Sequence, residues 1–352
     1  MTSSPSEVSV VPPQVTGVSS PPPDLGRPTA GTPKPHKRGA LTWVNRYALL
    51  IIWIILALAL AGITPDNFLQ AITFNTIFGT QSVLVILTLA LLLPLSMGDF
   101  DLSVANAMGM SGTLMVVLNG DKYGLPLVVA IAVAVGTGLL VGAVNGFLVV
   151  RLGVDAIVAT LGMGTLLLGL ASWVSGSIIQ TGIASGLTHA MDDKLIGLPL
   201  SFWYGIAIAA VFWYVLMFRP MGRRIAFVGQ NRDMARLSGV GVDRLRFFGF
   251  VGAGLIASLA GIMQAGQLGA YQASSATSYL LPTFAAAFLG TTVVNPGRFN
   301  PWGSVIAIYF LITGITGLNL LGLTGWVQDA FYGAALIVAV TLSTVVRNRV
   351  RT

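Results

Sequence analysis

The chain has 352 residues, of which 55% are hydrophobic and only 9% are charged, whereas soluble domains carry about 25% charged residues. This composition indicates an integral membrane protein. The formal net charge of +7 is therefore explained by basic residues at the membrane surface and not by a nucleic-acid partner. The absence of cysteine and the presence of only two histidines exclude disulfides, thiolate catalysis and a zinc site, so no metal or other cofactor is expected.

The first 46 residues are rich in Pro, Ser, Thr and Gly, and they end in a basic run that includes Lys34, Lys37, Arg38 and Arg46. They contain too few aliphatic side chains to bury a core, so residues 1–46 are expected to form a disordered cytoplasmic tail. They do not match a secretory signal, in which positive charges precede a short apolar stretch and a cleavage site.

Apolar stretches then follow one another as far as residue 346. A helix needs about 20 apolar residues to cross a hydrocarbon layer of about 30 Å. By this measure the expected spans are residues 47–63, 73–93, 104–118, 126–150, 156–175 and 201–218, two within 248–296, and 301–321 and 326–346. The sequence therefore predicts an all-α membrane protein, a polytopic bundle of about ten transmembrane helices over residues 47–346, with a short cytoplasmic tail at residues 347–352.

Basic residues are divided unequally between the two sides of this expected bundle. If the N-terminus is cytoplasmic, every Lys and Arg except Lys122 and Lys194 falls in a cytoplasmic tail or loop. Basic residues are retained on the cytoplasmic side of a membrane. Both termini are therefore expected in the cytoplasm, in a multi-pass protein of the inner or plasma membrane.

Gly98, Asp99, Asp101 and Ser103 form a polar motif between two apolar stretches. An aspartate costs about 2.5 to 3.5 kcal/mol at the centre of a membrane helix, so both carboxylates are expected at an interface or against protein. They form either a proton or cation site or a turn in which Asp and Ser cap the following helix. Pro94 and Gly98 favour the turn.

A weaker copy of this motif occurs at residues 290–297 and also precedes a glycine-rich helix. Two turns interrupted by Gly and Pro at corresponding places are typical of an internal repeat in a transporter, so a weak internal repeat is expected. Between the two turns, the polar segment 176–199 is the longest expected external loop. It suits the docking of an external protein, although any loop of this length would be polar.

Seven arginines lie in one polar segment, residues 219–247, which we call the arginine-rich segment. Its charge predicts a cytoplasmic loop. Within it, Asn231 is a suitable N-cap and Gly239 a suitable stop for a short helix. This helix would have a cationic face and an apolar face, made by Arg232 and Arg236 and by Met234 and Leu237, respectively. Such a helix suits a groove on a soluble partner or, alternatively, the lipid surface.

A nucleotide site of the P-loop type needs a lysine directly after a glycine. None of the four lysines, Lys34, Lys37, Lys122 and Lys194, follows a glycine, so the sequence excludes such a site. The chain is therefore not expected to be an enzyme. If ATP drives this protein, a separate subunit must hydrolyse it.

With these features the chain resembles the permease subunits of ATP-binding-cassette importers of the ribose, xylose and autoinducer-2 class, over about residues 46–347. The resemblance rests on GDFDLSV at 98–104, VNGFLV at 144–149, IVATLGMGTLLLG at 157–169, MGRRIAFVGQNRDMARLSGVGVDRLR at 221–246 and LNLLGL at 318–323. The joint order and spacing of these motifs are more specific than any one of them.

This resemblance implies a conduit for a sugar or sugar-like small polar solute, without a high-affinity pocket of its own. The implied partners are a pair of cytoplasmic ATPase subunits, an external solute-binding protein and a second permease subunit, as a homodimer surrounded by membrane lipid. The residues implied to couple ATP hydrolysis to transport are Gly222, Arg223, Asn231, Ala235, Arg236, Leu237, Ser238 and Gly239. The turn at Gly98, Asp99, Asp101 and Ser103 would lie near the solute pathway.

Two other functions are compatible with the residues. An ion-coupled secondary transporter would use Asp99 or Asp101 as its ion site and would need no ATPase. A permease for branched-chain amino acids would belong to the same class of importers. A membrane-embedded enzyme is disfavoured, because no nucleophile, metal cluster or pair of acids is visible within the expected spans.

Overall fold

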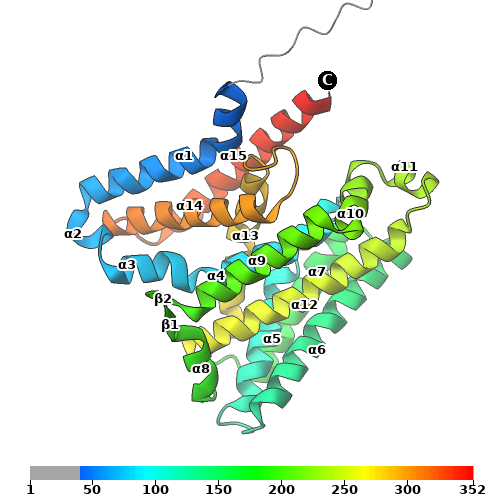
Figure 1. The fold of residues 1–352 in the computed structure, drawn as a ribbon. Helices are drawn as coiled ribbons and strands as arrows, with labels where there is room; N and C mark the ends of the chain where they lie inside the picture. The colour runs from blue at the N-terminus through cyan, green and yellow to red at the C-terminus, as the bar shows by residue number, and fades with distance from the viewer. Residues whose placement is uncertain (1–39, 352) are drawn as a thin grey trace, which may run out of the picture. The chain divides into compact units, whose positions relative to one another are not determined.

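The computed structural model describes residues 40–351, which are almost entirely helical (Figure 1). This agrees with the expected all-α membrane fold. Residues 1–39 of the expected tail (residues 1–46) lie outside the described residues. The remaining tail residues belong to the first helix, which begins at Ala40. The last helix continues to Arg351, so the boundary expected at residue 347 falls inside it.

The helices in chain order are α1 (Ala40–Ile63), α2 (Pro65–Phe68), α3 (Ala71–Asn75), the π-helix η1 (Thr76–Thr80), α4 (Ser82–Ser96), α5 (Val104–Asn119), α6 (Leu127–Gly146), the π-helix η2 (Phe147–Arg151), α7 (Ala156–Ser175), α8 (Ser185–Asp192), α9 (Leu200–Phe218), α10 (Pro220–Gln230), α11 (Arg232–Leu237), α12 (Val242–Leu268), the 3-10 helix η3 (Ala273–Tyr279), α13 (Leu280–Gly290), α14 (Pro301–Leu320) and α15 (Trp326–Arg351). A short hairpin pairs β1 (Lys194–Leu195) antiparallel with β2 (Leu198–Pro199). The two π-helices extend their neighbours into longer helical segments, residues 71–96 and 127–151.

Six helical segments among the described residues are long and apolar enough to cross a membrane, and three shorter apolar helices accompany them. The expected count of about ten spans is not confirmed. The main difference lies in residues 248–296, where two spans are expected. The 27-residue helix α12 provides one. In place of the second span, residues 273–290 form η3 and the 11-residue α13. α13 alone covers about 16 Å of a layer about 30 Å thick, which is too short to cross it.

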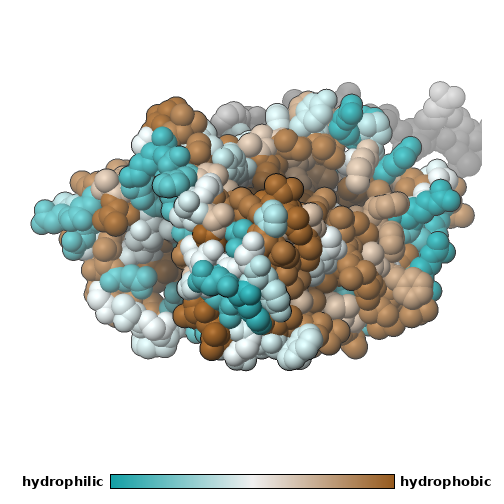
Figure 2. Space-filling view, turned by 90° about the horizontal axis from the view of Figure 1, so that it is seen from below, coloured by the Kyte–Doolittle hydropathy of each residue, from teal (hydrophilic) through white to brown (hydrophobic). Residues whose placement is uncertain are grey.

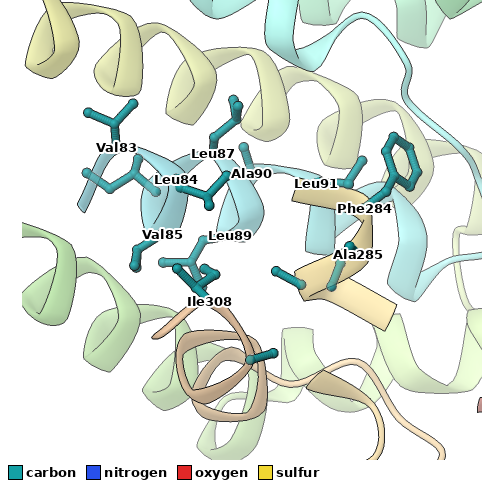
Figure 3. Close-up of a cluster of buried hydrophobic side chains, with 14 of the residues drawn as sticks. Val83, Leu84, Val85, Leu87, Leu89, Ala90, Leu91, Phe284, Ala285 and Ile308 are labelled. Carbon is teal, nitrogen blue, oxygen red and sulfur yellow. The ribbon is translucent and has the colours of Figure 1, made fainter. Parts of the chain in front are cut away.

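α4 is the central helix. Every residue from Ser82 to Leu92 is buried, as expected for a helix that is hydrophobic all round. α4 packs against α9, α12, α13 and α14. Figure 3 shows its side chains beside Phe284 and Ala285 of α13 and Ile308 of α14. A displacement of α4 would therefore affect most of the core.

The outer helices present apolar surface. In the most apolar windows of residues 127–151, α7 and α9, only 28%, 22% and 17% of the residues are buried. Figure 2 shows a face on which hydrophobic residues cover broad areas and hydrophilic residues gather in separate patches. Because lipid cannot hydrogen-bond to side chains, an apolar outer surface on helices is the expected form of a membrane-spanning protein.

Glycines bring α6 and α12 into close contact. A Cβ atom on Gly138 would meet the carbonyl oxygen of Gly254, and one on Gly142 would meet that of Phe250. Small residues at a crossing let two backbones approach closely within lipid. We therefore treat α6 and α12 as one packed unit.

The two ends of the bundle carry different elements. α10 and α11 lie at one end, and α8 with the β-hairpin lies at the opposite end (Figure 1). α12 connects the two ends, because it contacts α11 near Val242 and α8 near Leu268. The arginine-rich segment and the long polar loop are thus separated by the length of α12.

Candidate functional site

The arginine-rich segment folds into α10, α11 and the first turns of α12. The helix α10 is not predicted by the sequence analysis. It begins with Pro220 at a position where the fixed φ of proline favours a helix, and it ends before Asn231, which is extended with φ of −158°. The buried face of α10 consists of Gly222, Ile225 and Val228, and Arg223 lies on its exposed face.

α10 is packed directly on the end of α4. A Cβ atom on Gly229 would meet the carbonyl oxygen of Ser96, and one on Gly222 would meet the backbone of Leu216 in α9. Met97, the residue after α4, belongs to a small apolar cluster with Ile225, Val228, Ala235 and Val242. The arginine-rich segment therefore has a core of its own, and that core includes a residue from the end of α4.

α11 is the predicted short helix. Asn231 Oδ1 accepts hydrogen bonds from the backbone N–H groups of Asp233 and Met234, each at 3.0 Å. After the helix, Ser238 is the C-cap and Gly239 adopts a φ of +80°. The predicted N-cap and the predicted glycine stop are confirmed.

The apolar face of α11 points away from the protein. Ala235 is fully buried, whereas Met234 is 53% exposed and Leu237 is 84% exposed. Two large apolar side chains held outward on a rigid turn form the kind of surface that enters a hydrophobic groove. This geometry fits the predicted docking helix.

Arg236 has partners within the chain. Its Nη2 donates to Asp243 Oδ1 at 2.8 Å, and its Nη1 lies 3.8 Å from Asp233 Oδ1. The sequence analysis places Arg236 on the cationic face of this helix and, through the resemblance, among the coupling residues. In the structure, a change of charge there would also disturb the first turn of α12, so Leu237 is the better probe of docking.

Asp99 lies buried beneath this segment, with 3% of its surface exposed. Arg246 of α12 donates from Nε to Asp99 Oδ2 and from Nη2 to Oδ1, each at 2.7 Å. Arg232 of α11 donates from Nη2 to Asp99 Oδ1 and to the carbonyl oxygen of Met97, each at 2.8 Å. We call Asp99, Arg232 and Arg246 the Asp99 cluster. Through these charge-assisted bonds, one carboxylate joins the turn after α4 to both α11 and α12.

The expectation that Asp99 caps a helix is wrong. The next helix begins only at Val104, and the carboxylate of Asp99 is directed at the two guanidinium groups instead. The sequence analysis missed this pairing, because Asp99 lies 133 residues before Arg232 and 147 residues before Arg246. The available signal was the excess of arginine over acidic residues in the segment, which leaves cations that need a partner elsewhere.

Asp101 lies in the turn that the sequence predicts, but the expected capping of the next helix is wrong, because among the described residues Ser103 at the N-cap position of α5 makes no side-chain capping bond and Asp101 bonds only to Ser103. Gly98 enters this turn with φ of +82°. Asp101 Oδ1 accepts from the backbone N–H of Ser103 at 3.0 Å and from its hydroxyl at 2.6 Å, and Ser103 Oγ accepts from Asn145 Nδ2 at 2.7 Å. Burial raises the pKa of the Asp101 carboxyl, and the two hydrogen bonds from Ser103 oppose that rise. Asp101 therefore stabilises the backbone just before α5.

A cavity of about 470 Å³ adjoins the Asp99 cluster. Its ionisable lining residues are Asp99, Asp155, Arg232 and Arg246, so the two cations are balanced by two carboxylates. Asp155 is engaged as the N-cap of α7, where its Oδ1 accepts from the N–H groups of Ile157 and Val158. The balance of charge makes this cavity an unsuitable anion site.

The structure thus connects two predicted groups of residues that the sequence analysis treats separately. The turn at Gly98 and Asp99 meets the helix between Asn231 and Gly239 through Arg232, which the sequence analysis places on the cationic face of that helix but not among the coupling residues. Asp101 and Ser103 face α6 instead, through Asn145.

The comparisons with known proteins all name permeases, although the solutes in their names differ. Residues 72–340 match the family model described as "Branched-chain amino acid transport system / permease component". The chain is 30% identical over 315 residues to the ribose import permease protein of Escherichia coli strain K12, which covers 85% of this chain and 93% of that protein. It is 28% identical over 293 residues to the ribose import permease protein of Haemophilus influenzae, which covers 82% and 90%. It is 29% identical over 294 residues to the autoinducer 2 import system permease protein of Salmonella typhimurium, which covers 83% and 84%. No solved structure matches the chain.

Proposed function

This chain belongs to the permease-component family that it matches over residues 72–340, and we propose that it is the permease subunit of an ATP-binding-cassette importer for a sugar or sugar-like solute. A sugar is favoured over a branched-chain amino acid, because relatives at 28% to 30% identity are ribose and autoinducer 2 import permeases. The subunit itself is a conduit and not an enzyme, and ATP is hydrolysed on a separate subunit.

The observation that carries this proposal is the exposed apolar face of α11 above the Asp99 cluster. In the proposed mechanism, Met234 and Leu237 enter a groove on an ATPase subunit, and closure of the ATPases on ATP moves α11. Arg232 lies on α11, so the movement reaches Asp99 and, from there, the end of α4. Because α4 is the buried central helix, its displacement would switch the bundle between inward and outward openings.

The Asp99 cluster does not support the alternative of an ion-coupled secondary transporter. Two guanidinium groups already neutralise the carboxylate of Asp99 and would repel an incoming cation. The Oδ1 atom of Asp101 is engaged by Ser103. These contacts favour positioning roles for both aspartates.

The partners follow from this assignment. A pair of ATPase subunits would bind at the end that carries α10 and α11, which we place in the cytoplasm with both termini. An external solute-binding protein would bind at the opposite end, over the segment 176–199. A second copy of the chain would complete the transporter as a homodimer in the inner membrane. The placement of nearly all Lys and Arg residues on one side supports this orientation.

Transport in proteoliposomes tests the proposed function. The chain would be reconstituted with the ATPase subunit and the solute-binding protein of the same importer, and the uptake of labelled D-ribose and L-leucine would be measured. We expect uptake of ribose or a related sugar that requires ATP and all three proteins. Uptake by the permease alone, driven by an ion gradient, would favour a secondary transporter, and uptake of leucine without sugar would favour an amino-acid permease.

The orientation can be tested separately, since no native cysteine competes for a thiol reagent. Ser185 in α8 and Thr344 in α15 are both exposed. In intact cells, Ser185→Cys should react with a membrane-impermeant maleimide, and Thr344→Cys should react only after permeabilisation. The opposite pattern would reverse the proposed orientation.

A further inference from the structure

A second cavity lies at the end of the bundle opposite α11. Its volume is about 350 Å³, which is within the range of about 300 to 1,000 Å³ that is typical of small-molecule sites. The helical segment 71–80, the start of α9, the end of α12 and the hairpin all contribute to its wall. Several lining residues have polar side chains, although most of the exposed wall is apolar: the polar ones are Asn75, Thr76, Thr80, Asp192, Lys194, Ser201, Gln264, Gln267 and Tyr279.

The inner wall of this cavity is an ordered polar network. Gln264 is 3% exposed, and its Oε1 accepts from the Tyr271 hydroxyl at 2.7 Å. Gln267 Nε2 donates to Ser82 Oγ at 3.0 Å. These bonds fix the amide groups of two glutamines at the end of α12, so the wall is held in place before any solute arrives.

Ser201 has an unused hydroxyl at this wall. It is 1% exposed, and its Oγ atom has no hydrogen-bond partner within the part of the chain that the structure describes. A buried hydroxyl without a partner costs about 1 to 3 kcal/mol, so it is rare unless another molecule can satisfy it. Five buried side-chain atoms lack a partner within the described residues, and Ser201 Oγ is the one whose residue lines this cavity, where a water or a solute could satisfy it.

We propose that this cavity is a transit site that holds an uncharged, hydroxyl-rich solute after its delivery to the external face. Amides and hydroxyls both donate and accept hydrogen bonds, as do the hydroxyls of a sugar. The two charged lining residues, Asp192 and Lys194, have opposite signs and do not select a net charge. This inference rests on the proposed import function and adds the place and the chemistry of solute contact.

Solute protection in proteoliposomes tests the site directly. Thr80 is exposed and lines the cavity, so Thr80→Cys should react with a small methanethiosulfonate reagent added from outside. When D-ribose is present at about ten times its dissociation constant, the rate should fall about tenfold, because occupied sites are shielded. Ser274→Cys is the matched control, since Ser274 is exposed near the same end and does not line the cavity.

The removal of one hydroxyl provides a second measurement. Ser201→Ala breaks no hydrogen bond within the described residues, so the amount and the thermal stability of the protein should be unchanged. If Ser201 bonds the solute, maximal sugar uptake at saturating loaded binding protein should fall about fivefold, the value of one typical hydrogen bond. A purely structural serine would leave uptake unchanged.

The outcomes separate this inference from the proposed function. Suppose that the wild-type complex imports a sugar, that this sugar does not slow the labelling of Thr80→Cys, and that its uptake is unchanged in Ser201→Ala. The proposed transit site is then wrong, and the proposed function stands. Protection by L-leucine and not by D-ribose, or no labelling at Thr80→Cys while Ser274→Cys reacts, would also overturn the site. If the wild-type complex imports no sugar, the proposed function fails.

Discussion

Replacing Asp99 with asparagine is expected to abolish uptake and to destabilise the folded protein by about 3 to 5 kcal/mol, the usual cost of removing one partner from a buried ion pair. Arg246, whose side chain is only 11% exposed, would lose its counter-charge, and the NH₂ group of asparagine cannot accept a hydrogen bond from it. Thermal unfolding of the purified protein in detergent and ATP-driven uptake measure the two effects.

Asp101→Asn is the matched control for this change. Asparagine keeps an oxygen that accepts from Ser103, so the turn and most of the transport activity should survive. The double variant Asp99→Leu with Arg246→Leu separates stability from coupling. Because it removes the buried carboxylate together with the more deeply buried of its two guanidinium partners, it should recover much of the stability while uptake stays lost. Normal uptake in Asp99→Asn would contradict the coupling role of the cluster.

Leu237→Asp is expected to give the second large effect, and through docking alone. Leu237 is 84% exposed, so a polar substitution should not change the amount of protein in the membrane. Loss of an interface hot spot worth about 2 kcal/mol weakens binding about 30-fold. Co-purification of the ATPase subunit and stimulation of ATP hydrolysis by the loaded binding protein should therefore both fall.

Leu152→Asp is the control for Leu237→Asp. Leu152 is 60% exposed and follows η2, which packs on α12, so the same change of chemistry is made outside α11. Equal losses in both variants would point to a general surface effect. Gly239→Val adds a backbone test, because a side chain there has open space but strains the φ of +80° by about 1 to 3 kcal/mol. It should misalign α11 and lower uptake with little loss of protein.

The parts of this site that the sequence predicts are those whose signals lie close together. Asn231 and Gly239 flank a single short helix, so its N-cap and its stop can be recognised within nine residues of sequence. The turn at Gly98 is predicted on the same grounds. Local rules of this kind need no knowledge of how helices pack.

The parts that the sequence does not predict depend on packing between distant segments. Seven arginines look alike in the sequence, and only the fold brings Arg232 and Arg246 to Asp99. The sequence analysis missed the division of residues 273–290 into η3 and α13 because no charged residue marks it, although the run of Ser and Thr residues at 274–278 was an available signal. The cavity at Ser201 is assembled from four separate parts of the chain.

α12 connects the two places where the proposed transporter would meet its partners and its solute. It is one helix without proline, with Arg246 in the Asp99 cluster and Gln264 in the wall of the transit cavity, about 27 Å further along. It packs closely against α6 where Gly138 meets Gly254. If α12 moves as one body, binding at its two ends is thermodynamically linked. A solute that prefers one position of Gln264 would then change the affinity of α11 for the ATPase. Binding of the ATPase would change the affinity for the solute by the same factor.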